Sequence, residues 1–509
     1  MTSLPEKYRF RGPLASREQR SLHPCHRSDE RGRKVYDNIL QTIGNTPTVR
    51  LNRIPKDHGL ECEIYVKCEF FNPGGSIKDR ISEAMMRDEE KKGRAKTGLA
   101  FVEPTSGNTG IGMSLATAVA GYHCTIVTPD KNSDEKMNTM NLLGAKVVQT
   151  PAMAPWDSPE SFVSVTKRLL EENPDAICCD QYKNEVNPDT HYNYTAEEIL
   201  AAVGDLDMIV MGSGTGGTVT GVARKVKERC PKCVVVGVDP KGSIIFDSGS
   251  PNLYFVEGIG GDFVPEVLDK SLIDTIEKPN DYDSFNMARE IIRKEGLLCG
   301  GSSGAAMVSA IRAAKNLKLG AGKKVVVILP DGIRNYMTKF VCDQWMEAHL
   351  FKEPPERHSL WWNRCISNVE INRSVPQISE QSTVADALAA MRDKNDVTLV
   401  INDDGYFRGV LSKNSLRHAA TNPKKEGCGV LNLRDPVNRH YIKTYYKIVE
   451  NRGKPTLGLA SRILDIAPFV IVVEACHDYD GKILKGYIPK GIVTPEIMLE
   501  YILTHQEKN

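Results

Sequence analysis

One stretch of the chain brings a lysine to the start of a predicted helix: Phe70-Phe71-Asn72-Pro73-Gly74-Gly75-Ser76-Ile77-Lys78-Asp79-Arg80-Ile81. Its Gly-Gly-Ser segment is typical of a turn, and the residues that follow have helical spacing. Free N–H groups at a helix start carry positive partial charge, which disfavours protonation of a nearby amine. Such an amine suits Schiff-base chemistry with an aldehyde. The stretch therefore predicts a reactive Lys78, and an ordinary loop lysine is the simpler alternative.

Short apolar runs alternate with helical patterns from Val35 to about Leu350. Near-continuous β-branched runs separated by helices are typical of parallel strands buried on both faces. The sequence therefore predicts an α/β fold with open, mostly parallel sheets and helices on both faces. The predicted strands are residues 63–67, 99–102, 125–128, 208–211, 234–238 and 325–329.

Composition divides the chain into four predicted parts. Residues 1–34 are polar and rich in arginine, which predicts an N-terminal arm, and residues 35–350 form the α/β domain. Residues 351–371 are a predicted linker, because Pro354-Pro355 cannot continue a helix. Residues 372–509 contain a degenerate repeat of helix, strand, turn and strand. Its first copy has strands at 397–401 and 409–412, and its second copy has strands at 469–473 and 491–494.

Three further loops lead into predicted helices and carry small or polar residues. Thr105-Ser106-Gly107-Asn108-Thr109-Gly110, before a helix from about Ile111, offers hydroxyls and N–H groups that suit a carboxylate. Gly212-Ser213-Gly214-Thr215-Gly216-Gly217-Thr218 lets the backbone approach a phosphate closely. Gly300-Gly301-Ser302-Ser303 offers a hydroxyl to a cofactor ring nitrogen. Ordinary capped helices are the alternative for each loop.

The second of these loops also supports a rival hypothesis. Gly212, Gly214 and Gly217 satisfy G-x-G-x-x-G between a strand and a helix, and Asp239 follows about twenty residues later, as in dinucleotide-binding folds. A nicotinamide dehydrogenase is therefore an alternative, although it explains neither Lys78 nor the Thr105 loop. A non-catalytic ligand sensor built on the C-terminal repeat is another.

Together the motifs resemble those of the fold-type-II pyridoxal phosphate enzymes, and the chain as a whole is similar to the eukaryotic cystathionine β-synthase family. The C-terminal repeat resembles a tandem pair of the CBS domains named after that family, a Bateman module. The motifs that carry the resemblance are Asn72–Arg80, Thr105–Gly110, Gly214–Thr218, Glu257–Gly260 and Glu295–Ser302.

The resemblance implies a role for each matching residue. Lys78 would form a Schiff base with pyridoxal 5′-phosphate and later move the Cα proton of the substrate. Asn108 would bond the ring hydroxyl of the cofactor, and Ser302 its ring nitrogen. The residues implied to hold its phosphate are Gly214, Thr215, Gly216, Gly217 and Thr218. The residues implied to bind substrate are Thr105, Ser106, Thr109, Gln181 and Tyr182, with Gly258 and Gly260 at the mouth that admits the second substrate.

The resemblance also implies an activity. It is a β-replacement of transsulfuration, in which L-serine and L-homocysteine give L-cystathionine and water, with hydrogen sulfide released when cysteine replaces serine. A cysteine synthase that uses O-acetylserine and sulfide stays as the alternative, because its catalytic motifs overlap these. A homodimer is expected from the family.

Two features of the sequence depart from the family. Vertebrate-type members hold a haem with a Cys and a His of the N-terminal arm. Here Cys25 has only His23 and His26 beside it, too close in sequence to reach opposite porphyrin faces, so haem is not expected. The family's Gly-Ile-Gly-Tyr-Asp-Phe reads Gly258-Ile259-Gly260-Gly261-Asp262-Phe263, which removes an aromatic hydroxyl from the predicted mouth.

The C-terminal repeat departs as well. Adenosine-binding modules of this type place an acid three residues after the Ser or Thr that ends the second strand. After Ser412 that position is Ser415, and after Thr494 it is Ile497. Binding of S-adenosylmethionine is therefore not expected, and the repeat is predicted to serve dimer contacts or access to the active site.

Composition excludes several classes of protein. A formal net charge of +1 gives no electrostatic basis for binding nucleic acid or an acidic membrane surface. No apolar run approaches about 18 residues, so no membrane span is expected. Thirteen scattered cysteines without a secretory signal predict a reducing compartment, the cytoplasm. Cys230-Pro231-Lys232-Cys233 has no second ligand pair nearby, so no metal site is expected.

Overall fold

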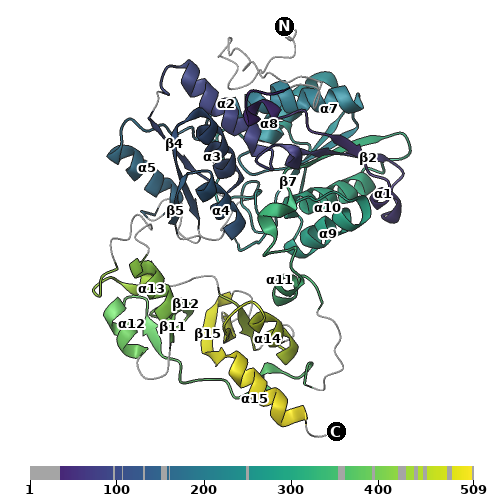
Figure 1. Ribbon diagram of the computed structural model, residues 1–509. Helices are drawn as coiled ribbons and strands as arrows, with labels where there is room; N and C mark the ends of the chain where they lie inside the picture. The colour runs from purple at the N-terminus through teal and green to yellow at the C-terminus, as the bar shows by residue number, and fades with distance from the viewer. Residues whose placement is uncertain are drawn as a thin grey trace. The chain divides into compact units, whose positions relative to one another are not determined.

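The computed structural model describes most of the chain, in two compact units that end and begin at Val341 and Cys342 (Figure 1). The predicted arm, residues 1–34, and Pro354-Pro355 of the predicted linker lie outside the described residues. The structure describes residues 35–95, 98–105, 107–129, 132–150, 158–159, 161–247, 252–353, 361–391, 396–421, 431–440, 445–450, 455–477 and 484–506.

The first unit is built on a six-stranded sheet with the order β1-β2-β9-β6-β7-β8. Strand β1 pairs antiparallel with β2, and every other neighbouring pair is parallel. The prediction of an open, mostly parallel sheet is therefore confirmed. The strands are β1 (Thr48–Arg50), β2 (Glu63–Cys68), β6 (Met208–Gly212), β7 (Val234–Val238), β8 (Thr275–Glu277) and β9 (Lys324–Leu329).

Helices cover both faces of this sheet (Figure 1). On one face, α7 (Ala196–Val203) and α8 (Gly217–Arg229) pack on Ile209, Val235 and Val326. On the other face, α10 (Gly301–Asn316) lies against β6, β7 and β9, and α9 (Asp281–Glu295) packs on α10. The strands can be almost wholly apolar because neither face meets water.

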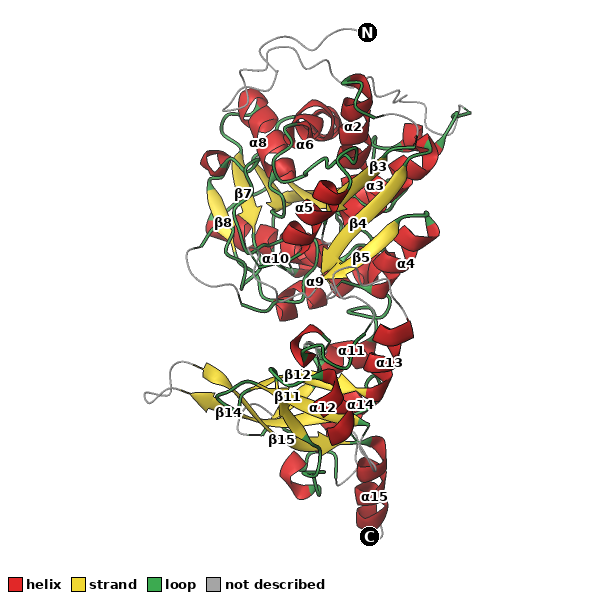
Figure 2. Ribbon diagram, turned by 90° about the vertical axis from the view of Figure 1, so that its left-hand side faces the viewer, coloured by secondary structure: helices red, strands yellow, loops and turns green. Residues whose placement is uncertain are grey.

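A second, smaller sheet of parallel strands completes this unit, with the order β3-β4-β5. Its strands are β3 (Ala100–Pro104), β4 (His123–Pro129) and β5 (Lys146–Thr150) (Figure 2). Helices α2 (Lys78–Lys91), α3 (Asn108–Ala120) and α4 (Asp134–Leu142) share one hydrophobic cluster with it. Helix α5 (Phe162–Glu172) shares another cluster, with Val102, Val127 and Val148.

Three consecutive helical elements form one uninterrupted helical segment in the first unit. It consists of α6 (Val186–Thr190), the π-helical turn η4 (His191–Thr195) and α7. Helix α8 packs against all three parts. Elsewhere in this unit, the short helix α1 (Ile54–Asp57) packs on α9.

The second unit contains the same arrangement twice. Sheet β10-β11-β12 and sheet β13-β14-β15 each join a parallel pair to an antiparallel pair, which confirms the predicted repeat. The predicted turn at Asp480-Gly481 lies outside the described residues. The elements are α11 (Asp343–Ala348), β10 (Gln377–Ser379), α12 (Val384–Ala390), β11 (Val397–Ile401), β12 (Phe407–Ser412), α13 (Lys413–Thr421), β13 (Lys447–Val449), α14 (Leu457–Leu464), β14 (Val470–His477), β15 (Leu484–Val493) and α15 (Pro495–Gln506).

A buried ion cluster fixes the first turn of α2 against α7. The Arg80 guanidinium, which is fully buried, donates to both carboxylate oxygens of Glu69 and to both of Glu198, at 2.6 to 2.8 Å. Lys67 also contacts Glu198, at 2.8 Å. Burial raises the pKa of Glu69, but Arg80 and Lys67 outweigh burial and the pKa ends below its ordinary value. The cluster therefore consists of buried charged groups, each of which is stabilised by the opposite charges of its neighbours.

We expect Arg80→Met to lower the free energy of unfolding by about 3–5 kcal/mol, because it leaves buried carboxylates uncompensated. Arg87→Met is the matched control: Arg87 lies on the same helix, 37% exposed, and pairs with Glu83 and Glu90. Its loss should cost about 0.5 kcal/mol. Urea denaturation of both variants makes the comparison, and equal losses would contradict this account of the cluster.

Candidate active site

Helix α2 begins at Lys78, as the sequence predicts, and its entry loop is held by the next residue. The carboxylate of Asp79 accepts the backbone N–H of Gly74 at 2.6 Å. A Cβ at Gly74 would lie 2.5 Å from Oδ1 of Asp79, so only glycine fits there. Burial raises the pKa of Asp79 to about 7. This closed loop sets the direction in which the Lys78 side chain leaves the helix.

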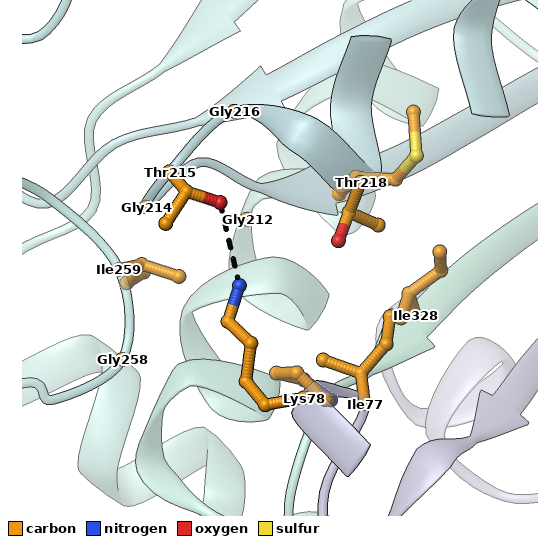
Figure 3. A pocket seen from close by; sticks show the side chains of 12 residues that line it. Ile77, Lys78, Gly212, Gly214, Thr215, Gly216, Thr218, Gly258, Ile259 and Ile328 are labelled. Carbon is orange, nitrogen blue, oxygen red and sulfur yellow. Dashed lines mark hydrogen bonds between the residues drawn. The ribbon is translucent and has the colours of Figure 1, made fainter. Parts of the chain in front are cut away.

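The Lys78 side chain extends into a cavity (Figure 3). Its Nζ lies 3.5 Å from Oγ1 of Thr215, and the dashed line in Figure 3 marks this hydrogen bond. Removal from water disfavours the ammonium form and lowers the pKa of Lys78 to about 8. The sequence attributes such a shift to the helix start, and the structure adds burial as its physical cause.

Four helices begin around this cavity: α2 at Lys78, α3 at Asn108, α8 at Gly217 and α10 at Gly301. The sequence predicts the start of α3 at about Ile111, three residues too late, and the start of α8 at Val222, five residues too late. The glycine and threonine residues before these predicted starts have the composition of a loop, but they form the first turn of each helix. The N–H groups of a first turn have no intrahelical partner. Their unpaired N–H groups and aligned dipoles make the cavity a site for anions.

The predicted phosphate loop lines one part of the cavity together with Lys78. Gly214, Thr215, Gly216 and Thr218 line this space, and Figure 3 shows the Thr215 hydroxyl bonded to Lys78. Gly217 does not line it and instead begins α8.

The predicted carboxylate loop lines an adjoining space of about 540 Å³ that also includes Lys78. Ser106 lies outside the described residues. The other predicted substrate and ring contacts in this space are Thr105, Asn108, Thr109, Gln181, Tyr182, Gly258, Gly260 and Ser302.

Within this group, Thr109 orients Gln181. The Thr109 hydroxyl donates to Oε1 of Gln181 at 2.6 Å, and Nε2 of Gln181 donates to the carbonyl of Pro104 at 3.1 Å. One N–H of the Gln181 amide remains after these two bonds. The α3 backbone and this remaining N–H are therefore the donors for a carboxylate.

The residues present fit pyridoxal phosphate. Oγ of Ser302 is buried and has no hydrogen-bond partner among the described residues, although it lines the cavity that contains Lys78. An unpartnered buried hydroxyl is costly unless a ligand completes it. A hydroxyl for the ring nitrogen, an amine for the aldehyde and a helix start for the phosphate thus surround one space.

The residues that hold Asn108 were not predicted from the sequence. Its Nδ2 donates to Oδ2 of Asp331 at 2.8 Å, and its Oδ1 accepts from Asn335 at 3.1 Å. Burial raises the pKa of Asp331. The position of Asp331, two residues after the strand β9, was the available signal, because the other site loops also follow strand ends.

Glu103 was missed as well. Its carboxylate accepts the backbone N–H groups of Asp180 and Gln181, both at 3.0 Å. Burial raises its pKa to about 7. Glu103 therefore ties the Gln181 segment to the end of β3, immediately before the Thr105 loop.

At the predicted mouth, another aromatic residue lies beside the glycines. The position of a Cβ on Gly260 would be 2.6 Å from the Tyr254 hydroxyl oxygen. Tyr254 therefore brings an aromatic hydroxyl beside Gly260, whereas a Cβ on Gly261 would meet Ile245.

The dinucleotide alternative loses its ribose acid. Asp239 is fully buried and pairs with Lys278 at 3.0 Å, and it does not line the cavity. Gly212 and Gly214 of the motif line the cavity with Lys78 instead.

Comparisons with known proteins identify the family of the chain. Residues 39–331 match the family of pyridoxal-phosphate dependent enzymes, and residues 366–422 match the CBS domain family. A cystathionine beta-synthase of Apis mellifera is 45% identical over 498 residues, which cover 96% of this chain and 95% of that protein. The chain belongs to the cystathionine β-synthase family.

Two further cystathionine β-synthases extend the comparison. The Mus musculus protein is 46% identical over 455 residues, covering 87% of this chain and 78% of its own length. The solved structure of an O-acetylserine dependent cystathionine beta-synthase from Helicobacter pylori is 36% identical, with a TM-score of 0.56, and covers 60% of this chain and 98% of its own.

Membership of the cystathionine β-synthase family confirms three predictions: a fold-type-II core with C-terminal CBS domains, pyridoxal phosphate as cofactor, and a lyase of transsulfuration. In the described part of the chain, no helix is long and apolar enough to cross a membrane. Nor do the described residues include a cluster of three or more His, Cys, Asp or Glu side chains that could hold a metal.

We expect covalent attachment of pyridoxal phosphate to the apo protein to depend on the Lys78 pKa of about 8. Only the neutral amine attacks an aldehyde, so attachment should rise with pH and be half-maximal near pH 8, about two units below an ordinary lysine. Borohydride trapping after short exposures, with peptide mapping of Lys78, measures this. Lys78→Arg should trap nothing, and a midpoint near pH 10 would contradict the effect of burial.

Proposed function

We propose that L-serine and L-homocysteine react to L-cystathionine and water in the cavity around Lys78. The observation that carries this proposal is the convergence of Lys78, the unpartnered Ser302 hydroxyl and the Gln181 segment on one space. An amine, a ring-nitrogen partner and a carboxylate site are what β-replacement on an amino acid requires.

Bound there, pyridoxal phosphate supplies an electron sink that acidifies the Cα–H of an amino acid. Gly214 to Thr218 and the α8 start hold its phosphate, Asn108 its ring hydroxyl and Ser302 its ring nitrogen. A serine hydroxyl does not stabilise a protonated ring nitrogen as a carboxylate does, which favours quick elimination.

Lys78 moves two protons in this proposal. Its neutral Nζ accepts the proton from Cα of L-serine, and the resulting ammonium donates a proton to the departing hydroxyl oxygen. A pKa near 8 suits both transfers, because the amine changes protonation state readily near neutral pH. Homocysteine enters past Gly258 and Gly260, and the neutral Lys78 amine accepts its thiol proton. The thiolate adds at Cβ, and Lys78 returns that proton to Cα.

The substrate carboxylate binds at the start of α3 and at Gln181, with Thr105 and Ser106 of the loop and with Tyr182 beside them. Thr109 contributes by fixing the Gln181 amide, since its hydroxyl hydrogen is already donated to Oε1. The sequence predicts that Thr109 binds the substrate carboxylate. We propose that only its backbone N–H contacts the carboxylate, and that its hydroxyl acts indirectly by orienting Gln181.

We expect Thr109→Val to raise KM for L-serine about tenfold with a smaller change in kcat, because it frees the Gln181 amide but leaves Lys78 intact. Thr117→Val is the matched control on the same helix: Thr117 is buried, and its hydroxyl bonds the carbonyl of Met113. Steady-state cystathionine formation from L-serine and L-homocysteine gives both constants. Equal effects of the two variants would indicate helix packing rather than substrate binding.

The second candidate function is cysteine synthesis from O-acetylserine and sulfide. It is favoured by the likeness to the O-acetylserine dependent Helicobacter pylori structure. The same assay decides: if wild type turned over O-acetylserine with sulfide but not L-serine with L-homocysteine, the primary proposal would be wrong. Release of hydrogen sulfide from L-cysteine follows from the same elimination, with sulfide as the leaving group.

For the C-terminal module, residues 372–509, we propose a structural or access-controlling role without S-adenosylmethionine. Ser415 stands where a ribose-binding acid is needed, and it is committed to local bonds: its Oγ accepts from the N–H of Ser412 at 2.9 Å and donates to the Ser412 carbonyl. Ile497, at the matching position of the second copy, has no polar side chain.

We expect calorimetric titration of the full chain with S-adenosylmethionine to show no submicromolar binding, and turnover to be unchanged by it. Pyridoxal phosphate added to the apo protein serves as the positive control for the calorimeter. Tight binding would overturn the argument from Ser415 and Ile497.

We further propose a homodimer in the cytoplasm without haem. We place catalysis in the first unit, which ends at Val341 rather than at the predicted residue 350, because Ala348 and three residues of the predicted linker 351–371, Ile366, Val369 and Ile371, belong to the core of the second unit. Every described cysteine is free, which suits a reducing compartment. The haem candidates Cys25, His23 and His26 lie outside the described residues.

A further inference from the structure

Two buried side chains lie directly behind the phosphate loop. Asn187 is in α6 and His191 opens the π-helical turn η4, so they are four residues apart on neighbouring turns. Both are fully buried. π-Helical turns are rare in proteins overall but occur often at functional sites, so the position of this pair indicates a functional role.

Glycines on α8 allow the close approach of this pair. A Cβ at Gly217 would lie 2.0 Å from Oδ1 of Asn187, and one at Gly221 would lie 2.1 Å from the carbonyl oxygen of Pro188. Any larger residue would push the α6–η4 segment away from α8. The glycine pair therefore places Asn187 and His191 within hydrogen-bond distance of the loop.

Asn187 fixes the hydrogen of Thr215. Its Nδ2 donates to the carbonyl of Gln181 at 2.8 Å and to Oγ1 of Thr215 at 3.0 Å. A carbonyl can only accept, so the amide nitrogen, and not its oxygen, must face this way. The Thr215 hydroxyl accepts from Asn187, and its own hydrogen is left for a partner in the cavity that it lines.

His191 stands in the same relation to Thr218. Its Nδ1 lies 3.0 Å from Oγ1 of Thr195, and its Nε2 lies 3.1 Å from Oγ1 of Thr218. A neutral imidazole donates at one nitrogen and accepts at the other. With the hydrogen on Nε2, Thr218 accepts and its own hydrogen is free for the cavity. With the other tautomer, Thr218 donates to the ring and turns a lone pair toward the cavity.

We propose that Asn187 and His191 fix Thr215 and Thr218 as hydrogen-bond donors toward the cofactor phosphate, with His191 in the Nε2–H form. The inference rests on the proposed function, which places that phosphate at residues 214–218. Phosphate oxygens only accept, so a hydroxyl binds them only when its hydrogen points to them. The hydroxyl of Thr195 donates to Nδ1 and holds the tautomer.

The bonds from Thr195 to His191, from His191 to Thr218 and from Thr218 to phosphate then run in one direction. Each bond polarises the next, which strengthens the last one in a low-dielectric site. Asn187 and His191 are positioning residues, since they act through the two threonines. Their effect is selectivity for an aldehyde that carries phosphate over the same aldehyde without it.

The test compares the binding of pyridoxal phosphate and pyridoxal to the full-length apo protein by absorbance titration. We expect His191→Leu to raise the Kd for pyridoxal phosphate about tenfold and to leave the Kd for pyridoxal within about twofold, because the Thr218 hydroxyl is no longer fixed as a donor toward the phosphate. His191→Gln keeps an N–H near the Nε2 position and should stay within about threefold of wild type for both.

Tyr192→Phe is the matched control. Tyr192 is the next residue of the same π-helical turn, and its hydroxyl donates to Glu228, away from the loop, at 2.7 Å. Both dissociation constants should be unchanged in this variant. A loss of phosphate preference in Tyr192→Phe would show that any disturbance of the turn is sufficient, and would overturn the inference.

The outcomes separate the two proposals. If wild type binds pyridoxal phosphate no more tightly than pyridoxal, the placement of phosphate at this loop is wrong. If wild type prefers the phosphate but His191→Leu weakens both ligands equally, or neither, the inference is wrong and the proposed function stands. Should His191→Leu not fold, Thr195→Val keeps the ring and frees its tautomer. It should lower the phosphate preference about threefold, and an unchanged preference would overturn the inference.

Discussion

Four helix N-termini meet at one lysine that must be able to lose its proton, and most of the first unit serves this arrangement. Positive partial charge at the helix starts and burial both lower the pKa of the Lys78 amine. Carboxylates also lie close by, at Asp79, Glu103 and Asp331, and a full negative charge on each would hold a proton on Lys78. Burial raises the pKa of all three, and each accepts at least one hydrogen bond from a neighbouring N–H or O–H donor. These three carboxyl groups therefore hold loops in place without strongly raising the pKa of Lys78.

The fold followed from the sequence where patterns are local. β-Branched runs such as Val234–Val238 and Val325–Leu329 match buried strands because two covered faces leave no place for polar residues. The starts of α3 and α8 were placed too late because glycine and threonine have low helix propensity, yet a first turn that binds an anion needs their small size and N–H groups.

The candidate site was predictable where loops carry glycine and hydroxyl motifs, and not where tertiary contacts complete it. Asn108 and Asp331 are separated by 223 residues in the chain, and no periodicity links them. Asn187 and His191 are polar residues within a helical segment, where the common expectation is a solvated face. Their burial becomes visible only once Gly217 and Gly221 bring α8 against them. A glycine pair four apart on a helix that follows a phosphate loop is the signal to look for.

The cluster around Arg80 has a consequence for the order in which the chain is made. Arg80 stands two residues after Lys78, and its partner Glu198 lies 118 residues further along the chain. During synthesis the N-terminal part therefore leaves the ribosome with Glu69 available to Arg80 but without Glu198, its second carboxylate partner. The ion cluster is complete only after α7 has emerged and docked, so the cofactor meets the finished site late in biogenesis rather than on the nascent chain.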